Sequence, residues 1–252
     1  MMTGDVWFWI LASLAAFSVG ASKGGLPGVG VLGVPILALS ISPVTAAGLL
    51  LPILIISDVY GLWLYRKSYD LWNIKLMVAA ATIGIAVGWA TAHVTNDDLV
   101  KLLVGIIGLS YFADALLKFR RVIEPKPADI PRGLFWGSIA GFTSFVAHAG
   151  GPPYQMFVLP QKLDKMTYAG TATITFAIIN LLKLPPYWFL GQVNLGSLET
   201  GLYLTPIALI GAFLGYRLTR IIPEAIFFRV VEAALFVLSL KLIYDGIVGL
   251  AS

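Results

Sequence analysis

Val19-Gly20-Ala21-Ser22-Lys23-Gly24-Gly25-Leu26-Pro27-Gly28 interrupts an apolar run that begins at Val6 and resumes at Val29. Adjacent glycines and a proline do not continue a helix smoothly, because glycine costs backbone entropy and proline lacks an N–H donor. Lys23 stands beside this break, within an otherwise apolar stretch. An ionisable group in such surroundings predicts a functional site at an interrupted helix.

A second break of the same kind lies near the middle of the chain, in Phe145-Val146-Ala147-His148-Ala149-Gly150-Gly151-Pro152-Pro153-Tyr154. Two interrupted helices, each carrying one ionisable group, are typical of secondary transporters. Aligning the breaks on their glycine pairs matches Gly24 with Gly150, Gly25 with Gly151, Pro27 with Pro153 and Ser22 with His148.

The composition predicts an all-α polytopic membrane protein. Of 252 residues, 58% are hydrophobic and 12% are charged, whereas about 25% of the residues in a soluble domain are charged. Several apolar windows reach the roughly 20 residues that a helix needs to cross a bilayer. The chain has no cysteine, which excludes disulfides and thiol chemistry. Its net charge of +4 is spread over loops, which indicates topology and not a nucleic-acid-binding patch.

The remaining apolar segments fall into two sets separated by a basic, proline-containing linker at residues 118–132. We therefore expect a first transmembrane repeat at residues 1–117 and a second at residues 133–252. The expected spans of the first set after its break are Val44–Tyr65, Leu71–His93 and Leu99–Leu117. Those of the second set are Thr167–Tyr187, Gly196–Thr219 and Phe227–Val248.

Matching residues occur in the same order in the two halves. The motif Thr45-x-x-Gly48 corresponds to Thr167-x-x-Gly170, and Asp58 then corresponds to Asn180. The pair Gly84 and Gly88 corresponds to Gly211 and Gly215, a small-xxx-small spacing that lets helices approach closely. The shared order indicates an internal repeat.

Basic residues distinguish two topologies. If each broken segment crosses the membrane once, the chain has eight spans, and Lys and Arg are divided poorly between the two sides. If each break is the tip of a re-entrant hairpin, each half has a hairpin and three spans, and only Lys101 and Lys183 among the loop-side basic residues lie outside. The positive-inside rule favours the second arrangement. It predicts inverted repeats, a cytoplasmic linker and both termini in the periplasm.

At these residues the chain is similar to the sulfite exporter TauE/SafE family of bacterial membrane proteins. The resemblance covers essentially the whole chain and is carried by both breaks, by the helix Thr45–Tyr60 with its Pro52, and by the run from Leu163 to Pro186. It implies secondary transport of sulfur oxyanions or organosulfonates across the bacterial inner membrane. Lys23 and His148 depart from the family's usual break, which is richer in glycine and uncharged.

Each ionisable residue has a functional and a structural interpretation. Lys23 could face an anionic substrate or snorkel to the surface. His148 could carry a proton, since its reference pKa lies near 6.5, or be hydrogen-bonded within the fold. Asp58 could pair with Lys23, and Asp58 and Asn180 could take part in coupling or form interhelical hydrogen bonds. The candidate coupling and gating residues are Asp58, Asn180 and His148.

The residues of the breaks are candidates for substrate binding. Glycines allow close backbone approach, and prolines suit the first turn of a following helix, whose N–H groups would face an anion. Simple kinking of the helices is the alternative. The candidate substrate-binding residues are Ser22, Lys23, Gly24, Gly25, Pro27, His148, Gly150, Gly151, Pro152, Pro153 and Gln155.

These observations predict a non-enzymatic secondary transporter for a small anion, with sulfite or a related sulfur oxyanion as the first candidate. The alternatives are a permease for organosulfonates or other small organic anions, an anion channel, or a membrane-embedded enzyme. We expect no metal and no cofactor, because the two histidines lie far apart and cysteine is absent. The expected partners are the anion, protons and membrane lipids, and no nucleic acid.

Overall fold

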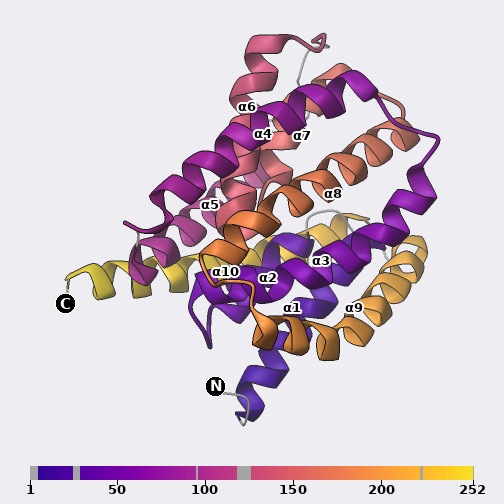
Figure 1. Ribbon diagram of the computed structural model, residues 1–252. Helices are drawn as coiled ribbons and strands as arrows, with labels where there is room; N and C mark the ends of the chain where they lie inside the picture. The colour runs from indigo at the N-terminus through magenta and orange to yellow at the C-terminus, as the bar shows by residue number, and fades with distance from the viewer. Residues whose placement is uncertain (1–4, 25–28, 95, 118–125, 222–223, 252) are drawn as a thin grey trace.

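The computed structural model describes residues 5–24, 29–94, 96–117, 126–221 and 224–251, which form helices joined by short loops (Figure 1). No strand occurs in these ranges. The α-helices are α1 (Val6–Lys23), α2 (Gly33–Leu37), α3 (Pro43–Tyr65), α4 (Leu71–Ala92), α5 (Asp97–Leu117), α6 (Ile130–Ala147), α7 (Gly151–Val158), α8 (Lys165–Phe189), α9 (Leu195–Ile221) and α10 (Glu224–Ala251). The 3-10 helices are η1 (Val29–Leu32) and η3 (Leu159–Gln161).

Five of the described helices are long and apolar enough to cross a membrane. This confirms the predicted all-α, polytopic membrane class. The five segments are Val6–Lys23, Pro43–Trp63, Leu71–Ala92, Leu195–Gly215 and Ala233–Ala251.

Polar side chains begin several of the helices. The N-cap residues Ser42, Asp70, Asp129 and Asp164 each accept a hydrogen bond from a backbone N–H in the first turn of α3, α4, α6 and α8. Such caps satisfy donors that have no partner within the helix. At α8, hydrogen bonds from Thr167 lower the pKa of the Asp164 carboxyl. The Asp164 carboxylate is therefore negatively charged over the physiological pH range, and it interacts favourably with the positive end of the α8 dipole.

Glycines set the closest helix contacts. A Cβ on Gly84 of α4 would lie 1.9 Å from the carbonyl oxygen of Ser138 on α6, and one on Gly211 of α9 would lie 2.4 Å from the carbonyl oxygen of Phe17 on α1. Only glycine permits these approaches, so the packing role expected for the two small-xxx-small pairs is confirmed. The helices α4 and α6, α1 and α9, and α5 and α10 form the most extensive pairs.

The equivalent helices α3 and α8 lie side by side and run in opposite directions (Figure 1). Gly48, near the start of α3, packs against the backbone of Gln192, just beyond the end of α8. Gly170, near the start of α8, packs against the backbone of Ser68, just beyond the end of α3. A Cβ at either glycine would lie about 2 Å from the facing carbonyl oxygen (2.1 and 1.7 Å).

Within the first half, by contrast, α1 and α3 run in the same direction. Gly33 of α2 lies against Val19 of α1 and Leu50 of α3. Further along both helices, Lys23 of α1 contacts Asp58 of α3. The chain between α1 and α3 must therefore return toward the side from which α1 came.

The second half has the same arrangement, because α6 and α8 also share a direction. A Cβ on Gly150, which follows α6, would lie within 3.0 Å of atoms of Ala140 and Ser144 of α6 and of Phe176 of α8. Further along, the Tyr187 hydroxyl of α8 donates to the Phe145 carbonyl of α6. The segment containing α7 and η3 thus returns in the same way as the segment containing η1 and α2.

Candidate functional site

The first break brings a lysine to a buried carboxylate. Lys23 is the last residue of α1, and its ammonium forms an ion pair with Oδ1 of Asp58 on α3. Asp58 is buried and the Lys23 side chain is only 16% exposed. A buried carboxylate is stable only when it is paired and hydrogen-bonded. The pairing expected from the sequence is therefore present, and Lys23 does not snorkel away from the interior.

The second oxygen of this carboxylate binds the equivalent residue of the other half. Asn180 Nδ2 on α8 donates to Asp58 Oδ2 across 2.7 Å, and both side chains are buried. Asp58 is thus held between α1 and α8. The two residues that the predicted repeat aligns meet directly where α3 and α8 pack together.

A second lysine lies on the same helix as Asn180, and it is fully buried (0% exposed). The ammonium of Lys183 lies 3.1 Å from the Ser144 carbonyl oxygen, 3.1 Å from Ser144 Oγ and 2.8 Å from His148 Nδ1. The sequence-based topology counted Lys183 among the loop-side basic residues, and this placement was wrong. Acceptors at the end of α6 satisfy its three donors.

His148 ends α6 in the left-handed conformation, with φ 52° and ψ 27°; its backbone N–H donates to the Ser144 carbonyl, and the N–H of Ala149 donates to the Thr143 carbonyl. This turn directs the imidazole toward α3, where Nε2 lies 2.8 Å from the Ala47 carbonyl oxygen. Because the Ala47 carbonyl oxygen can only accept, Nε2 carries the proton and donates to it, and Nδ1 of the neutral ring is left to accept from Lys183 Nζ. The imidazole in this arrangement is neutral, and both ring nitrogens are engaged.

Lys23, Asp58, His148, Asn180 and Lys183 form what we call the polar cluster. It connects the end of α1 to the end of α6 through the two central helices α3 and α8. The described residues contain no group of three His, Cys, Asp or Glu side chains placed to hold a metal ion. The chemistry available to the cluster is therefore charge pairing, hydrogen bonding and proton transfer.

The two glycines of the second break have different surroundings. A Cβ on Gly150 would lie 2.7 Å from the Ala140 carbonyl oxygen and 2.8 Å from the Phe176 ring. A Cβ on Gly151 would meet no described atom within 4 Å. Gly150 is thus required for packing, whereas Gly151 borders open space at the tip.

The helix after this tip offers few backbone donors. Pro152 and Pro153 occupy the first turn of α7, as expected, but they have no N–H. One turn later, the carboxamide oxygen of Gln155 is buried with no hydrogen-bond partner among the described residues. The first turn of α7 therefore presents few N–H groups to an anion at this tip.

The first break is described only in part. Gly24 caps α1 through backbone hydrogen bonds to Ala21 and Gly20. The Ser22 hydroxyl donates to the Val19 carbonyl across 2.6 Å and packs against η1 at Gly30. Gly25 and Pro27 lie outside the described residues. Among the described candidates of this break, Lys23 is the one that reaches the polar cluster.

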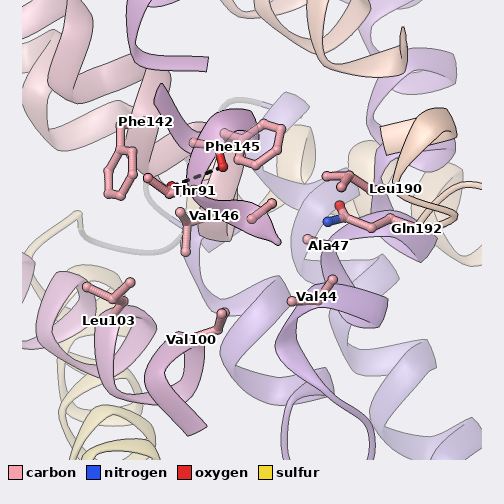
Figure 2. Close-up of a pocket in the computed structure, with 12 residues that line it drawn as sticks. Val44, Ala47, Thr91, Val100, Leu103, Phe142, Phe145, Val146, Leu190 and Gln192 are labelled. Atoms are coloured by element: carbon pink, nitrogen blue, oxygen red, sulfur yellow. Dashed lines mark hydrogen bonds between the residues drawn. The ribbon is translucent and has the colours of Figure 1, made fainter. Parts of the chain in front are cut away.

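A cavity of about 150 Å³ lies next to Ala47 (Figure 2). Ala47, whose carbonyl accepts from His148, contributes to its wall, as do Phe145 and Val146 at the end of α6. The rest of the lining comes from helix ends and is mostly apolar, with Thr91 and Gln192 as polar members. The remaining lining residues are Val44, Gly88, Ala92, Val100, Leu103, Phe142 and Leu190.

Sequence reasoning missed Lys183, although a signal for it was present. Lys183 stands three residues after Asn180 within the apolar run Leu181-Leu182-Lys183-Leu184. Residues three apart on a helix share a face, so a buried Asn180 places Lys183 on the interior side. Its position near the end of the expected span made it resemble a residue at the membrane surface.

The comparisons with known proteins place this chain in a family. A model of the family described as sulfite exporter TauE/SafE matches residues 12–242. The comparisons with curated proteins and with solved structures gave no match. The matched range includes both breaks and every residue of the polar cluster. The chain therefore belongs to the sulfite exporter TauE/SafE family.

Proposed function

We propose that this protein is a secondary transporter that moves a small anion, with sulfite or a related sulfur oxyanion as the first candidate, across the bacterial inner membrane. The observation that carries the proposal is the convergence of both interrupted helices on one polar cluster. Two lysines and one carboxylate meet there in an interior otherwise built of apolar helices. Intramembrane charges of this kind mark ion and substrate pathways.

Alternating access would follow from two inverted repeats, each a re-entrant broken hairpin followed by three spanning helices. The antiparallel run of α3 and α8 supports this arrangement, as does the shared direction of the helices that flank each break. Contacts are also exchanged between the halves. Gly48 packs on Gln192 as Gly170 packs on Ser68, and α1 packs on α9 as α6 packs on α4. Rocking of one repeat against the other would expose the cluster to each side in turn.

Exposed aromatic side chains support the proposed span boundaries. Trp89 and Phe189, at the ends of α4 and α8, are exposed and stack with ring centroids 6.0 Å apart. Trp63 and Trp72 are exposed at the opposite ends, where α3 stops and α4 starts. Aromatic residues favour the two membrane–water interfaces, where they contact lipid headgroups. The first group would face the periplasm, together with both termini, and the second would face the cytoplasm.

The cavity favours an organosulfonate as a second candidate substrate. Its lining combines the aromatic residues Phe142 and Phe145 with aliphatic side chains, and it touches Ala47 beside His148. An anionic head could occupy the polar cluster while a short apolar tail filled this space. In the proposed topology, the cavity lies on the periplasmic side of the cluster.

Flux measurements on reconstituted vesicles test the proposed function. Vesicles, empty or loaded with unlabelled anion, would be given labelled sulfite or methanesulfonate outside and assayed for saturable uptake, counterflow and unchanged product. Counterflow would support a carrier and exclude a channel, and chemical change of the anion would indicate an enzyme. Absence of flux for every sulfur oxyanion and organosulfonate in the panel would reject the proposed substrate class.

A further inference from the structure

The charges of the polar cluster do not balance among the described residues. The Lys23 ammonium is paired with the Asp58 carboxylate, and Asp58 forms no second contact ion pair among the described residues. His148 is neutral in its observed hydrogen-bonding arrangement, and the Tyr187 hydroxyl beside it donates to the Phe145 carbonyl. The titratable groups facing the cluster from α1, α3, α6 and α8 are thus Lys23, Asp58, His148, Lys183 and Tyr187.

The contacts of Lys183 are those of an ammonium. Its three neighbours at hydrogen-bond distance are acceptors, and two of them belong to Ser144 in the last turn of α6. A charged lysine has three donors, which matches this number. The negative end of the α6 dipole also favours a cation at this position.

We propose that Lys183 supplies the one uncompensated positive charge of the cluster, so that the site selects a singly charged anionic headgroup. The inference rests on the proposed function and deepens it by assigning the charge of the substrate. A monoanion neutralises the cluster, whereas a dianion leaves a net negative charge in a poorly solvated interior, which is costly. His148 and Ser144 hold the Lys183 ammonium in the anion-free site.

Fixed-charge anions and charge variants separate this inference from a purely structural role of Lys183. Methanesulfonate carries one negative charge at neutral pH, and sulfate carries two. Binding of each to the purified full-length protein would be measured calorimetrically at pH 7. Three variants change the net charge of the polar cluster, which is +1 in the wild type. It becomes 0 in Lys183→Gln, +2 in Asp58→Asn and +1 in the double variant Asp58→Asn/Lys183→Gln.

The wild type should bind methanesulfonate more tightly than sulfate. Lys183→Gln should weaken methanesulfonate binding about ten- to hundredfold, the range for losing a charge-assisted hydrogen bond. Asp58→Asn should shift the preference toward sulfate. The double variant should recover methanesulfonate binding, because it restores the net charge without restoring the lysine.

Several outcomes would overturn the inference. Unchanged binding by Lys183→Gln would mean that Lys183 carries no charge relevant to the anion. A double variant as weak as Lys183→Gln would show that net charge does not govern binding. If Lys183→Gln does not fold, Asp58→Asn alone provides the test, and an unchanged preference between the two anions rejects the inference. Failure of the wild type to bind or transport any anion would instead reject the proposed function.

Discussion

Asn180 donates a hydrogen bond to Asp58 across 2.7 Å, and the repeat predicted from the sequence aligns these two residues with each other. In many internal repeats, equivalent residues lie far apart. Here they meet because α3 and α8 are antiparallel neighbours at the centre of the molecule. A carboxylate in one half and an amide in the other make this contact favourable, whereas two carboxylates would repel each other.

The first prediction concerns the ion pair at the end of α1. Lys23→Gln should weaken anion binding and also lower the melting temperature, because it leaves the buried Asp58 carboxylate without its cation. Removing one partner of a buried pair costs about 3–5 kcal/mol. Lys23→Arg should retain part of the binding, since its charge remains. Thermal unfolding in detergent and vesicle flux would be measured on the same preparations.

The double variant Lys23→Gln/Asp58→Asn is the control for stability. It removes both charges and keeps the shape of the pair, so its melting temperature should lie close to that of the wild type. A double variant as unstable as Lys23→Gln would mean that the stability loss does not arise from an unpaired carboxylate. Wild-type transport by Lys23→Gln would remove Lys23 from the proposed site.

The second prediction concerns pH dependence at His148. Protonation of its ring would turn the Nδ1 acceptor into a donor, and the Lys183 ammonium would lose this partner. The added charge would favour anion binding, so affinity should rise as the pH falls and the ring becomes protonated. His148→Asn keeps an acceptor and tolerates the left-handed backbone, but does not titrate.

The asparagine variant should therefore bind the anion with a flattened pH profile. The measurement is the dissociation constant of methanesulfonate from pH 5 to 8, because this anion keeps its charge over that range. A variant profile that matches the wild type would make His148 a structural residue and leave Asp58 as the candidate for proton coupling.

The third prediction compares the glycines of the second tip. Gly151→Ala should fold normally, because the added methyl group meets no described atom. It should nevertheless reduce transport by about tenfold or more if the anion occupies this space, as expected for one methyl group in a tight pocket. Gly150→Ala is the matched variant, and it should lose about 1–3 kcal/mol of stability through contact with Ala140 and Phe176. Undiminished flux in a stable Gly151→Ala protein would place the substrate elsewhere.

The fourth prediction concerns topology. Reporter fusions at the C-terminus and within the linker at residues 118–132 should give opposite signals, periplasmic and cytoplasmic. A re-entrant hairpin returns to the side from which it entered, so each half crosses the membrane three times. Each half therefore begins and ends on opposite sides of the membrane. Signals from the same side would contradict the inverted arrangement and favour a single crossing at each break.

The sequence by itself determined the class of the protein and the places where its helices stop. Apolar windows long enough to span a bilayer predicted α3, α4, α9 and α10, because hydrophobic length is a local property that membrane crossing requires. Glycine and proline predicted both breaks for an equally local reason, the conformational limits of the backbone. The pairing of Lys23 with Asp58 could also be inferred, since an interior charge requires a partner.

The tertiary structure decided which side chains join the site. Lys183 is interior because α6 ends against α8 and offers the Ser144 carbonyl of its last turn and the His148 ring as acceptors, and neither contact is encoded near residue 183. The different surroundings of Gly150 and Gly151 likewise depend on Phe176, which comes from another helix. Contacts between segments remote in sequence depend on how helices cross, and helix crossing is set by packing over the whole molecule and not by local pattern.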